Sequence, residues 1–230
     1  MNVGIFTTIK ITNGIPLFWD KHHKRLISQA EKLNVGRPHI SLQEIQIYLK
    51  HNSLTDCALK ITITKHKGLI FEHRQLPLIL PTYKLITVRD TRNHWKIYKT
   101  TDRAVNEHAK KLAEEKDADD ALFTLDDTII ESTICNVFSL NKQGKIITPP
   151  IRARGLNGIT RQLIRENIKV LEADILDNTK HPLVLVNSIR VQKITHLNGK
   201  KLSDGQRLAQ KLQTIITNCE KKYLSEKTLA

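Results

Sequence analysis

Short apolar runs separated by turn signals are the feature that most constrains the fold of this 230-residue chain. Residues 3–11 alternate and are rich in Ile and Thr, which is typical of a strand. Asn13-Gly14 then predicts a tight turn into a partner strand over 15–18. The same pattern predicts further strands over 59–64, 69–76 and 84–88, with a turn at Lys67-Gly68.

Two amphipathic helices are expected among these strands. Asp20 is a candidate N-cap for a helix that carries Leu26, Ala30 and Leu33 on one face. Ser41 and Glu44 have the spacing of a capping box and predict the start of a second helix. The first 88 residues therefore predict an α+β unit with an antiparallel sheet.

The polar segment 90–95 is the expected connection between two domains, residues 1–89 and residues 90–230. After it we expect a helix from Thr101 or Asp102 to Lys116, with Ala104, His108, Leu112 and Ala113 on its inner side. Later strands are predicted over 121–125, 129–131, 137–140, 145–148, 183–186 and 191–197, and later helices from Gly158 and over 206–223.

Composition fits an ordinary globular protein, because 40% of the residues are hydrophobic and 26% are charged. No apolar run approaches the roughly 20 residues that a membrane helix needs, and no signal peptide is evident at the start. The three cysteines lie far apart and without metal-ligand spacing, which favours reduced thiols in a cytoplasmic protein and no metal site.

The net charge of +14 would attract nucleic acid or an anionic substrate. The basic residues are spread along the whole chain, and few aromatic side chains are present to stack on bases. A solvated basic surface is therefore favoured over nucleic-acid binding.

Six short motifs follow one another in a specific order. They are His22-His23-Lys24-Arg25-Leu26, Lys99-Thr100, Ala118-Asp119-Asp120-Ala121-Leu122, the segment from Glu131 to Phe138, Asn157-Gly158-Ile159-Thr160-Arg161-Gln162, and Asn187-Ser188-Ile189-Arg190. Each motif alone is weak, but the ordered series resembles the fold-type IV pyridoxal-phosphate enzymes, the class IV aminotransferase family. The resemblance spans nearly the whole chain.

The resemblance implies an α+β fold of two domains, in which a small N-terminal domain precedes a larger one with a β-barrel-like core. It also implies pyridoxal 5'-phosphate as the cofactor, lying between the domains, and a homodimer that acts on a small-molecule substrate.

Lys99 and Glu131 are the central residues that the resemblance singles out. Lys99 would carry the cofactor as a Schiff base, for which burial and nearby cations free the amine lone pair. Glu131 lies in an apolar stretch, where a carboxylate must be paired or functional. The resemblance places it on the pyridine nitrogen, and a local salt bridge is the alternative.

The remaining cofactor contacts are also implied by the resemblance. Arg25 would bind the phosphate, which suits the fork of a guanidinium group. The amides of Ile159 and Thr160, at a helix start, and the hydroxyl of Ser188 would complete the phosphate site. Asn136 is expected to support a loop.

The family contains lyases and aminotransferases, and two segments favour a lyase. Asn157-Gly158-Ile159 stands where aminotransferases more often have Pro-Gly-Ile, and the opening Gly4-Ile5-Phe6-Thr7-Thr8 points the same way. We therefore expect a lyase that converts 4-amino-4-deoxychorismate to 4-aminobenzoate and pyruvate in folate biosynthesis. Its two substrate carboxylates make Lys65, Lys67 and Arg190 candidate partners.

Two alternatives remain open. An aminotransferase of branched-chain or D-amino acids would use the same lysine and cofactor. A non-catalytic family descendant is favoured by the basic charge and by the lack of a segment that relatives usually carry ahead of Gly4. The turn Lys65-His66-Lys67-Gly68 differs from the arginine- and glycine-rich turn of many relatives and leaves the substrate open.

Overall fold

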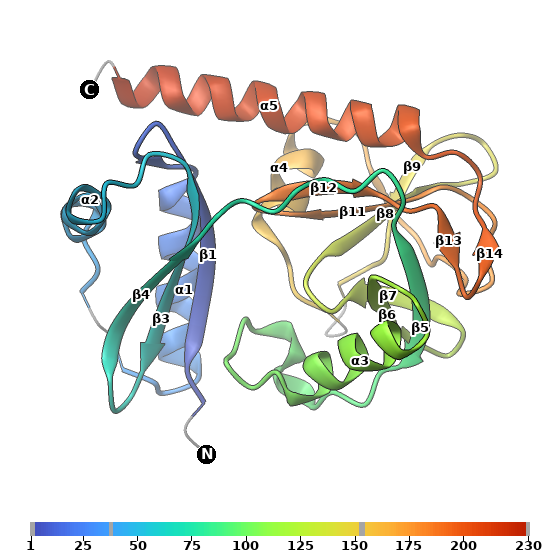
Figure 1. Cartoon of the computed structure of the whole chain (residues 1–230), viewed down its shortest axis with the longest axis horizontal. Coiled ribbons are helices and arrows are strands. Elements are labelled where there is room, and N and C mark those ends of the chain that lie inside the picture. The colour runs from blue at the N-terminus through green and yellow to red at the C-terminus, as the bar shows by residue number, and fades with distance from the viewer. Residues whose placement is uncertain (1–2, 37–38, 152–154, 229–230) are drawn as a thin grey trace. The chain divides into compact units, whose positions relative to one another are not determined.

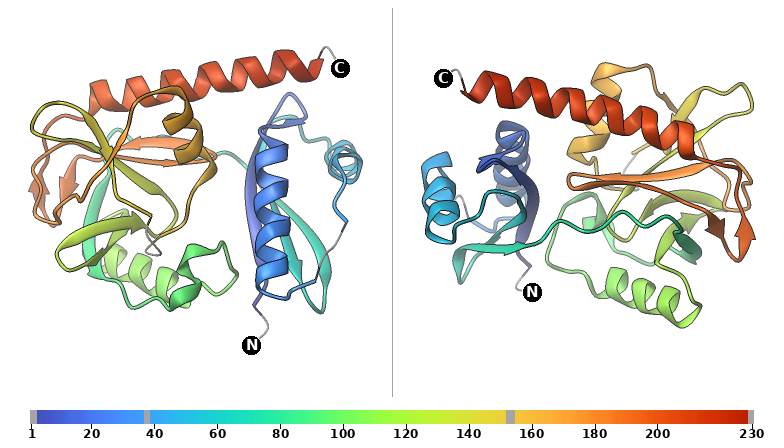
Figure 2. Two further views of the ribbon diagram at one scale, coloured as in Figure 1. Left: turned by 180° about the vertical axis from the view of Figure 1, so that it is seen from behind. Right: turned by 45° about the horizontal axis from the view of Figure 1, so that its top comes forward.

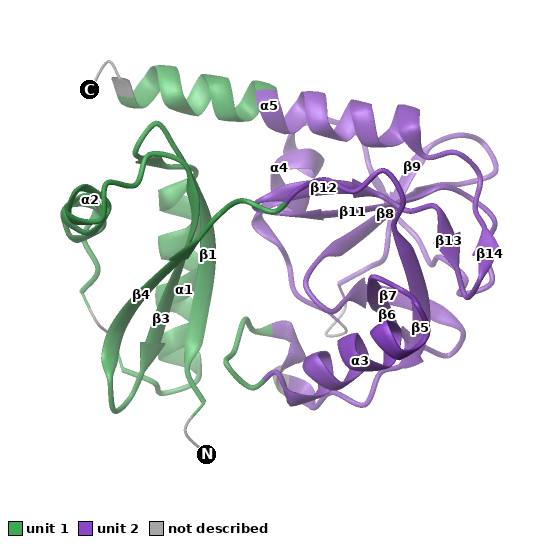
Figure 3. Ribbon diagram, in the orientation of Figure 1, with its two compact units in different colours: residues 1–77, 98–102, 218–230 green, residues 78–97, 103–217 purple. Residues whose placement is uncertain are grey.

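The computed structural model describes residues 3–36, 39–151 and 155–228 of the chain (Figure 1). It has five α-helices within these residues and is an α+β protein, as predicted. The chain forms two compact units (Figure 3). Unit 1 comprises residues 1–77, 98–102 and 218–230, and unit 2 comprises residues 78–97 and 103–217. Lys99 thus belongs to unit 1, and the domain division at residues 89 and 90 stays a prediction.

Unit 1 is built on an antiparallel sheet with the strand order β2-β1-β3-β4. Asn13 and Gly14 both have positive φ, at 52° and 74°, which is the conformation of the predicted hairpin turn. The turn therefore returns the chain directly beside β1. The strands are β1 (Ile5–Thr12), β2 (Ile15–Pro16), β3 (Cys57–Thr64) and β4 (Gly68–Arg74).

Helices α1 (Trp19–Lys32) and α2 (Leu42–His51) complete the core of unit 1 (Figure 2). Alternate residues of β1, including Ile5 and Ile9, pack with Leu26 of α1 and Ile45 of α2. This packing places the inward face of α1 against the sheet.

The two helix starts of unit 1 differ in how well the sequence predicted them. The capping box of Ser41 and Glu44 is confirmed, since each side chain accepts a hydrogen bond from the other residue's amide. The predicted N-cap Asp20 is wrong. The N-cap is Phe18, in the left-handed conformation, so the helix begins two residues earlier than predicted. Asp20 lies in the first turn, where its charge suits the helix dipole.

Residues 98–102 join unit 1 at the edge of β1. The amide of Phe6 donates to the carbonyl of Lys99 at 2.9 Å, and the amide of Thr101 donates to the carbonyl of Gly4 at 2.8 Å. A Cβ on Gly4 would lie 2.7 Å from the carbonyl oxygen of Ile63. The close approach at this end of the sheet therefore requires glycine.

Unit 2 contains two five-stranded sheets, with the orders β10-β9-β8-β11-β12 and β14-β13-β5-β6-β7. Side chains from both sheets, such as Leu122 and Leu185, share one core. The strands are β5 (Lys84–Arg89), β6 (Asp120–Leu125), β7 (Thr128–Ser132), β8 (Asn136–Leu140), β9 (Ile146–Thr148), β10 (Leu171–Glu172), β11 (Leu183–Asn187), β12 (Arg190–Lys193), β13 (His196–Leu197) and β14 (Lys200–Lys201).

Strand β5 pairs in parallel with β6, and not with the antiparallel sheet expected for the first 88 residues. The crossover contains the 3-10 helix η1 (His94–Ile97) and α3 (Ala104–Glu115), as parallel neighbours require. The inner face of α3 is Asn106, Ala109 and Ala113.

Of the predicted inner residues, Ala113 is buried and Leu112 is partly buried, whereas Ala104 and His108 are exposed. The prediction was wrong at Ala104 and His108 because the polar Asn106 was not counted as an inner residue. Its buried amide donates to the carbonyl of Thr133 at 2.9 Å, so its polar group is satisfied.

Helix α4 (Ile159–Asn167) packs on the sheet of β8 and β11, and so does the first part of α5 (Gln206–Thr228). None of the helices in the described parts of the chain has the length and apolar composition to cross a membrane.

The start of α4 is anchored by Arg161, whose side chain is fully buried. Its guanidinium donates to the carbonyl of Pro149 at 3.2 Å and to Glu172 at 2.6 Å. Arg161 thereby ties α4 to the ends of β9 and β10.

We predict that Arg161→Met lowers the free energy of unfolding by about 2 kcal/mol, because it removes the hydrogen bonds of a buried guanidinium to the Pro149 carbonyl and to the partly exposed Glu172. Arg165 is the matched control, since it contacts the same Glu172 at 3.2 Å from a side chain that is 38% exposed. Arg165→Met should cost less than about 1 kcal/mol. Urea denaturation measures both, and equal losses would contradict this role for Arg161.

Candidate active site

Lys99 is fixed through its backbone on both sides. Its amide donates to Gln29 Oε1 of α1 at 3.0 Å, and its carbonyl accepts from the amide of Phe6. The Lys99 ammonium lies 4.7 Å from the centroid of the Phe6 ring, a cation–π distance. The half-buried amine therefore projects from a defined point at the start of β1.

Arg25 lies on α1 one turn before Gln29, and Thr7 of β1 holds it. Its Nη2 donates to Thr7 Oγ1 at 2.8 Å. The Nε atom is buried without a hydrogen-bond partner, and burial lowers the pKa of Arg25 to about 10. A buried guanidinium with an unsatisfied donor is suited to an anion such as phosphate.

Glu131 lies near the end of β7 in unit 2, 6% exposed, and both its carboxylate oxygens have partners. Oε1 accepts from Arg92 Nη1 at 2.7 Å, and Oε2 accepts from the amide of Leu156 at 3.1 Å. The local salt bridge that the sequence left as an alternative is therefore present.

Arg92 is itself held by Asp90, which also accepts from Lys96 Nζ at 2.8 Å. Burial raises the pKa of Asp90, but hydrogen bonds from Arg92 and Lys96 outweigh it and hold the pKa below its usual value. The alternating charges of Lys96, Asp90, Arg92 and Glu131 compensate one another.

Sequence reasoning missed this network, because it treated residues 90–95 as an irregular connection. Asp90 is fully buried, with a side chain 0% exposed, and Arg92 is 8% exposed. The available signal was Glu131 itself, since a carboxylate in an apolar strand requires a cation nearby.

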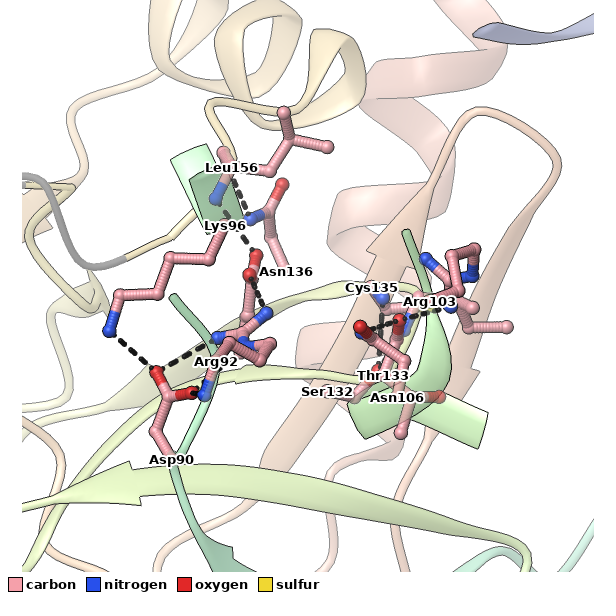
Figure 4. A network of polar contacts seen from close by, with 12 residues as sticks. Asp90, Arg92, Lys96, Arg103, Asn106, Ser132, Thr133, Cys135, Asn136 and Leu156 are labelled. Atoms are coloured by element: carbon pink, nitrogen blue, oxygen red, sulfur yellow. Dashed lines mark hydrogen bonds and ion pairs between the residues drawn. The ribbon is translucent and has the colours of Figure 1, made fainter. Parts of the chain in front are cut away.

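The turn after Glu131 is also fixed. The carbonyl of Thr133 accepts from Arg103 Nη2 and Asn106 Nδ2, each at 2.9 Å, and Ser132 Oγ accepts from the amide of Cys135 at 2.9 Å (Figure 4). These contacts hold the end of β7 in place.

Two glycines allow the loop before α4 to approach these strands. A Cβ on Gly155 would lie 3.2 Å from Glu131 Oε2, and one on Gly158 would lie 2.2 Å from Asn136 Oδ1. Asn136 Nδ2 donates to the carbonyl of Leu156 at 2.9 Å, so Asn136 supports the loop. A side chain at Gly158 would displace this support.

The start of α4 has no side-chain cap, because Gly158 occupies the N-cap position. The first amides of a helix lack partners within the helix, so those of Ile159 and Thr160 are available for an anion. Ser188 is half-buried on the turn between β11 and β12. Asn187 Oδ1 accepts from the amides of Ile189 and Arg190 and shapes that turn.

The three candidate substrate residues occupy different settings. Lys65 and Lys67 are exposed on the turn between β3 and β4 of unit 1. Arg190 of unit 2 is half-buried, with its Cζ 5.6 Å from the centroid of the Tyr83 ring. Arg190 Nη2 donates to Tyr83 Oη at 3.5 Å.

Comparison with known proteins gives several matches along the chain. A curated D-alanine aminotransferase from Bacillus licheniformis is 27% identical over 247 residues, covering 94% of this chain and 87% of the relative.

Two solved structures are similar in fold. A Legionella pneumophila protein, provisionally described as a 4-amino-4-deoxychorismate lyase, has a TM-score of 0.83 at 22% identity, covering 94% of this chain and 91% of the other. The PLP-bound form of a Mycobacterium tuberculosis protein, described as a hypothetical aminotransferase, has a TM-score of 0.80 at 17% identity, covering 94% and 88%.

The sequence profile of the family described as amino-transferase class IV matches residues 4–188. The match therefore contains Arg25, Lys99, Glu131 and the start of α4, together with the loops and glycines that position them. On this evidence of sequence and fold, the chain belongs to the class IV aminotransferase family.

Proposed function

We propose that this protein is a pyridoxal-phosphate enzyme that converts 4-amino-4-deoxychorismate to 4-aminobenzoate and pyruvate. The observation that carries the cofactor is the Arg25 guanidinium, whose buried Nε has no hydrogen-bond partner, on the same strand–helix pair that fixes Lys99. Membership of the family and the PLP-bound Mycobacterium tuberculosis relative support the same cofactor.

Each unit supplies groups that suit a different part of the cofactor. In unit 1, Lys99 would attach the aldehyde carbon and Arg25 would bind the phosphate. In unit 2, Glu131 would accept a hydrogen bond from the ring nitrogen, and Ile159 and Thr160 amides with the Ser188 hydroxyl would bind phosphate oxygens. Within each unit, the residues present suit the part of the cofactor that they would hold.

Pyridoxal phosphate, when bound, supplies an electron-withdrawing ring that stabilises negative charge on the carbon bearing the substrate amine. Glu131, paired with Arg92, would hold a proton on the ring nitrogen. Lys99 Nζ, released by the incoming amine, would remove the proton from the amine-bearing carbon. Lys99 or water would then protonate the enolpyruvyl side chain, after which pyruvate leaves and the ring becomes aromatic.

The lyase assignment is supported by Asn157-Gly158-Ile159, by the Gly4-Ile5-Phe6-Thr7-Thr8 segment and by the fold of the Legionella pneumophila protein. The substrate carries two carboxylates, for which Lys65, Lys67 and Arg190 are the proposed partners. Cationic side chains favour such a dianion.

A second candidate is amino transfer from D-alanine, which the 27% identical Bacillus licheniformis relative favours. This reaction would use the same Lys99 and cofactor but would need an amino acceptor. We also propose a homodimer, which sedimentation measurements test.

We predict that the protein releases 4-aminobenzoate from 4-amino-4-deoxychorismate, measured by the fluorescence of this product. Lys99→Ala should lower the rate by at least about a hundredfold, because no other amine replaces the proton-transferring one. Lys50→Ala, an exposed lysine of unit 1, is the control and should retain the parental rate.

The same preparations distinguish the second candidate. Incubation with D-alanine and 2-oxoglutarate should give little glutamate if the protein is a lyase. Rapid glutamate formation without 4-aminobenzoate would replace the lyase assignment with amino transfer. Product release by Lys99→Ala at the parental rate would contradict both.

A further prediction concerns Arg92 as a positioning residue for Glu131. Arg92→Met removes a hydrogen bond to a charged group, worth about ten- to a hundredfold in kcat. The attraction to Glu131 helps to hold the pKa of Arg92 above its usual value. The same attraction favours the ionised carboxylate, so Arg92→Met should need a higher pH to reach its full activity. The pH profile of kcat measures this.

Arg92→Lys should restore part of the rate, since it keeps the positive charge. Lys96→Met removes a cation that contacts Asp90 and should lower kcat less than Arg92→Met does. A parental pH profile in Arg92→Met would show that Arg92 does not tune Glu131.

A further inference from the structure

His22, Arg25 and Gln29 lie along one face of α1, at the spacing i, i+3 and i+7. All three reach groups at the start of β1 or beside it. His22 Nδ1 lies 2.6 Å from Thr7 Oγ1, Arg25 donates to the same oxygen, and Gln29 accepts from the amide of Lys99. This face of α1 therefore connects Arg25, the candidate phosphate ligand, and Lys99, the candidate Schiff-base residue, to β1.

Arg25, like Arg103 and Arg190, is a partly buried arginine that pairs with no described carboxylate. Among the residues that the structure describes, Thr7 Oγ1 is the acceptor that Arg25 meets, and no carboxylate pairs with it. Arg92 and Arg161, in contrast, are each paired with a carboxylate. A carboxylate beside Arg25 would neutralise its charge and compete with any incoming anion, whereas a hydroxyl fixes its position without doing so.

His22 completes the arrangement, since it is only 1% exposed. Burial, followed by the charges of Arg25 and Lys99, holds the pKa of His22 well below its usual value. The imidazole is therefore neutral at neutral pH, and its Nδ1 can accept a hydrogen bond.

His22, Thr7 and Arg25 then form a consistent chain of hydrogen bonds. We assign the Thr7 hydroxyl as donor to His22 Nδ1 and as acceptor from Arg25 Nη2. A hydroxyl has one hydrogen and two lone pairs, so both bonds can form together. Each bond polarises the next and strengthens it.

We propose that Thr7 and His22 are positioning residues that hold the Arg25 guanidinium for the phosphate of the cofactor through neutral groups alone. This rests on the proposed cofactor site. The sequence indicates Thr7 only weakly, as the polar member of the inward series Ile5, Thr7, Ile9 and Ile11.

The proposal predicts an effect that depends on the phosphate and not on the rest of the cofactor. Thr7→Val keeps the shape of the side chain but removes the hydroxyl, and Thr7→Ser keeps the hydroxyl. Equilibrium dialysis of each apo-protein against pyridoxal phosphate and against pyridoxal, which lacks the phosphate, separates the two contributions.

Thr7→Val should weaken pyridoxal phosphate binding by about tenfold, because an oriented hydrogen bond to a charged group is lost. Its pyridoxal binding should change by less than about twofold, and Thr7→Ser should bind both as the parent does. A second pair of variants, at His22, tests the same role in case Thr7→Val does not fold. His22→Leu should reproduce the selective loss, and His22→Asn, which offers an acceptor near the Nδ1 position, should restore binding.

Two results would overturn the proposal. Equal weakening of pyridoxal and pyridoxal phosphate by Thr7→Val would indicate a general structural role, and unchanged binding of both would indicate no role. Failure of the parent protein to bind pyridoxal phosphate at all would overturn the proposed cofactor site as well. If the variants lose pyridoxal phosphate binding selectively but the parent shows no lyase activity, the positioning role of Thr7 and His22 would stand and only the lyase reaction would be rejected.

Discussion

The cost of burying a charge is the constraint on which the rest of this structure depends. Glu131 lies in an apolar strand. Its charge is compensated by a series of ion pairs with charges of alternating sign, formed by Arg92, Asp90 and Lys96. Arg25 differs from Glu131, because its hydrogen-bond partner among the described residues is the neutral hydroxyl of Thr7. A carboxylate paired with a cation, such as Glu131, suits a protonated ring nitrogen. A guanidinium without a carboxylate partner, such as Arg25, suits a phosphate group.

Close backbone approach is the second requirement of this arrangement. Gly4 admits residues 98–102 beside β1, and Gly155 and Gly158 admit the loop before α4 beside Glu131 and Asn136. A Cβ at these positions would meet atoms at between 2.2 and 3.2 Å. The family motifs therefore specify where the backbone passes as much as which side chains react.

Local patterns predicted much of the fold, including the Asn13-Gly14 turn, the capping box of Ser41 and most strands. Predictions failed where distant partners decide: Asn106 is an inner residue only because Thr133 accepts its hydrogen bond. Strand β5 joined unit 2 through parallel pairing with β6, which no local pattern of β5 reveals. For the candidate site, resemblance singled out Arg25, Lys99 and Glu131, whereas Thr7 and Arg92 emerged only from three-dimensional contacts.

The proposed function depends on the amine of Lys99, which would carry pyridoxal phosphate. Borohydride reduction of the holoprotein fixes a lysine-bound cofactor, and peptide mass spectrometry then locates it. The account predicts the added mass on the peptide containing Lys99, and on no other lysine. Added mass at a different lysine, or none on a protein that has retained stoichiometric cofactor, would contradict it.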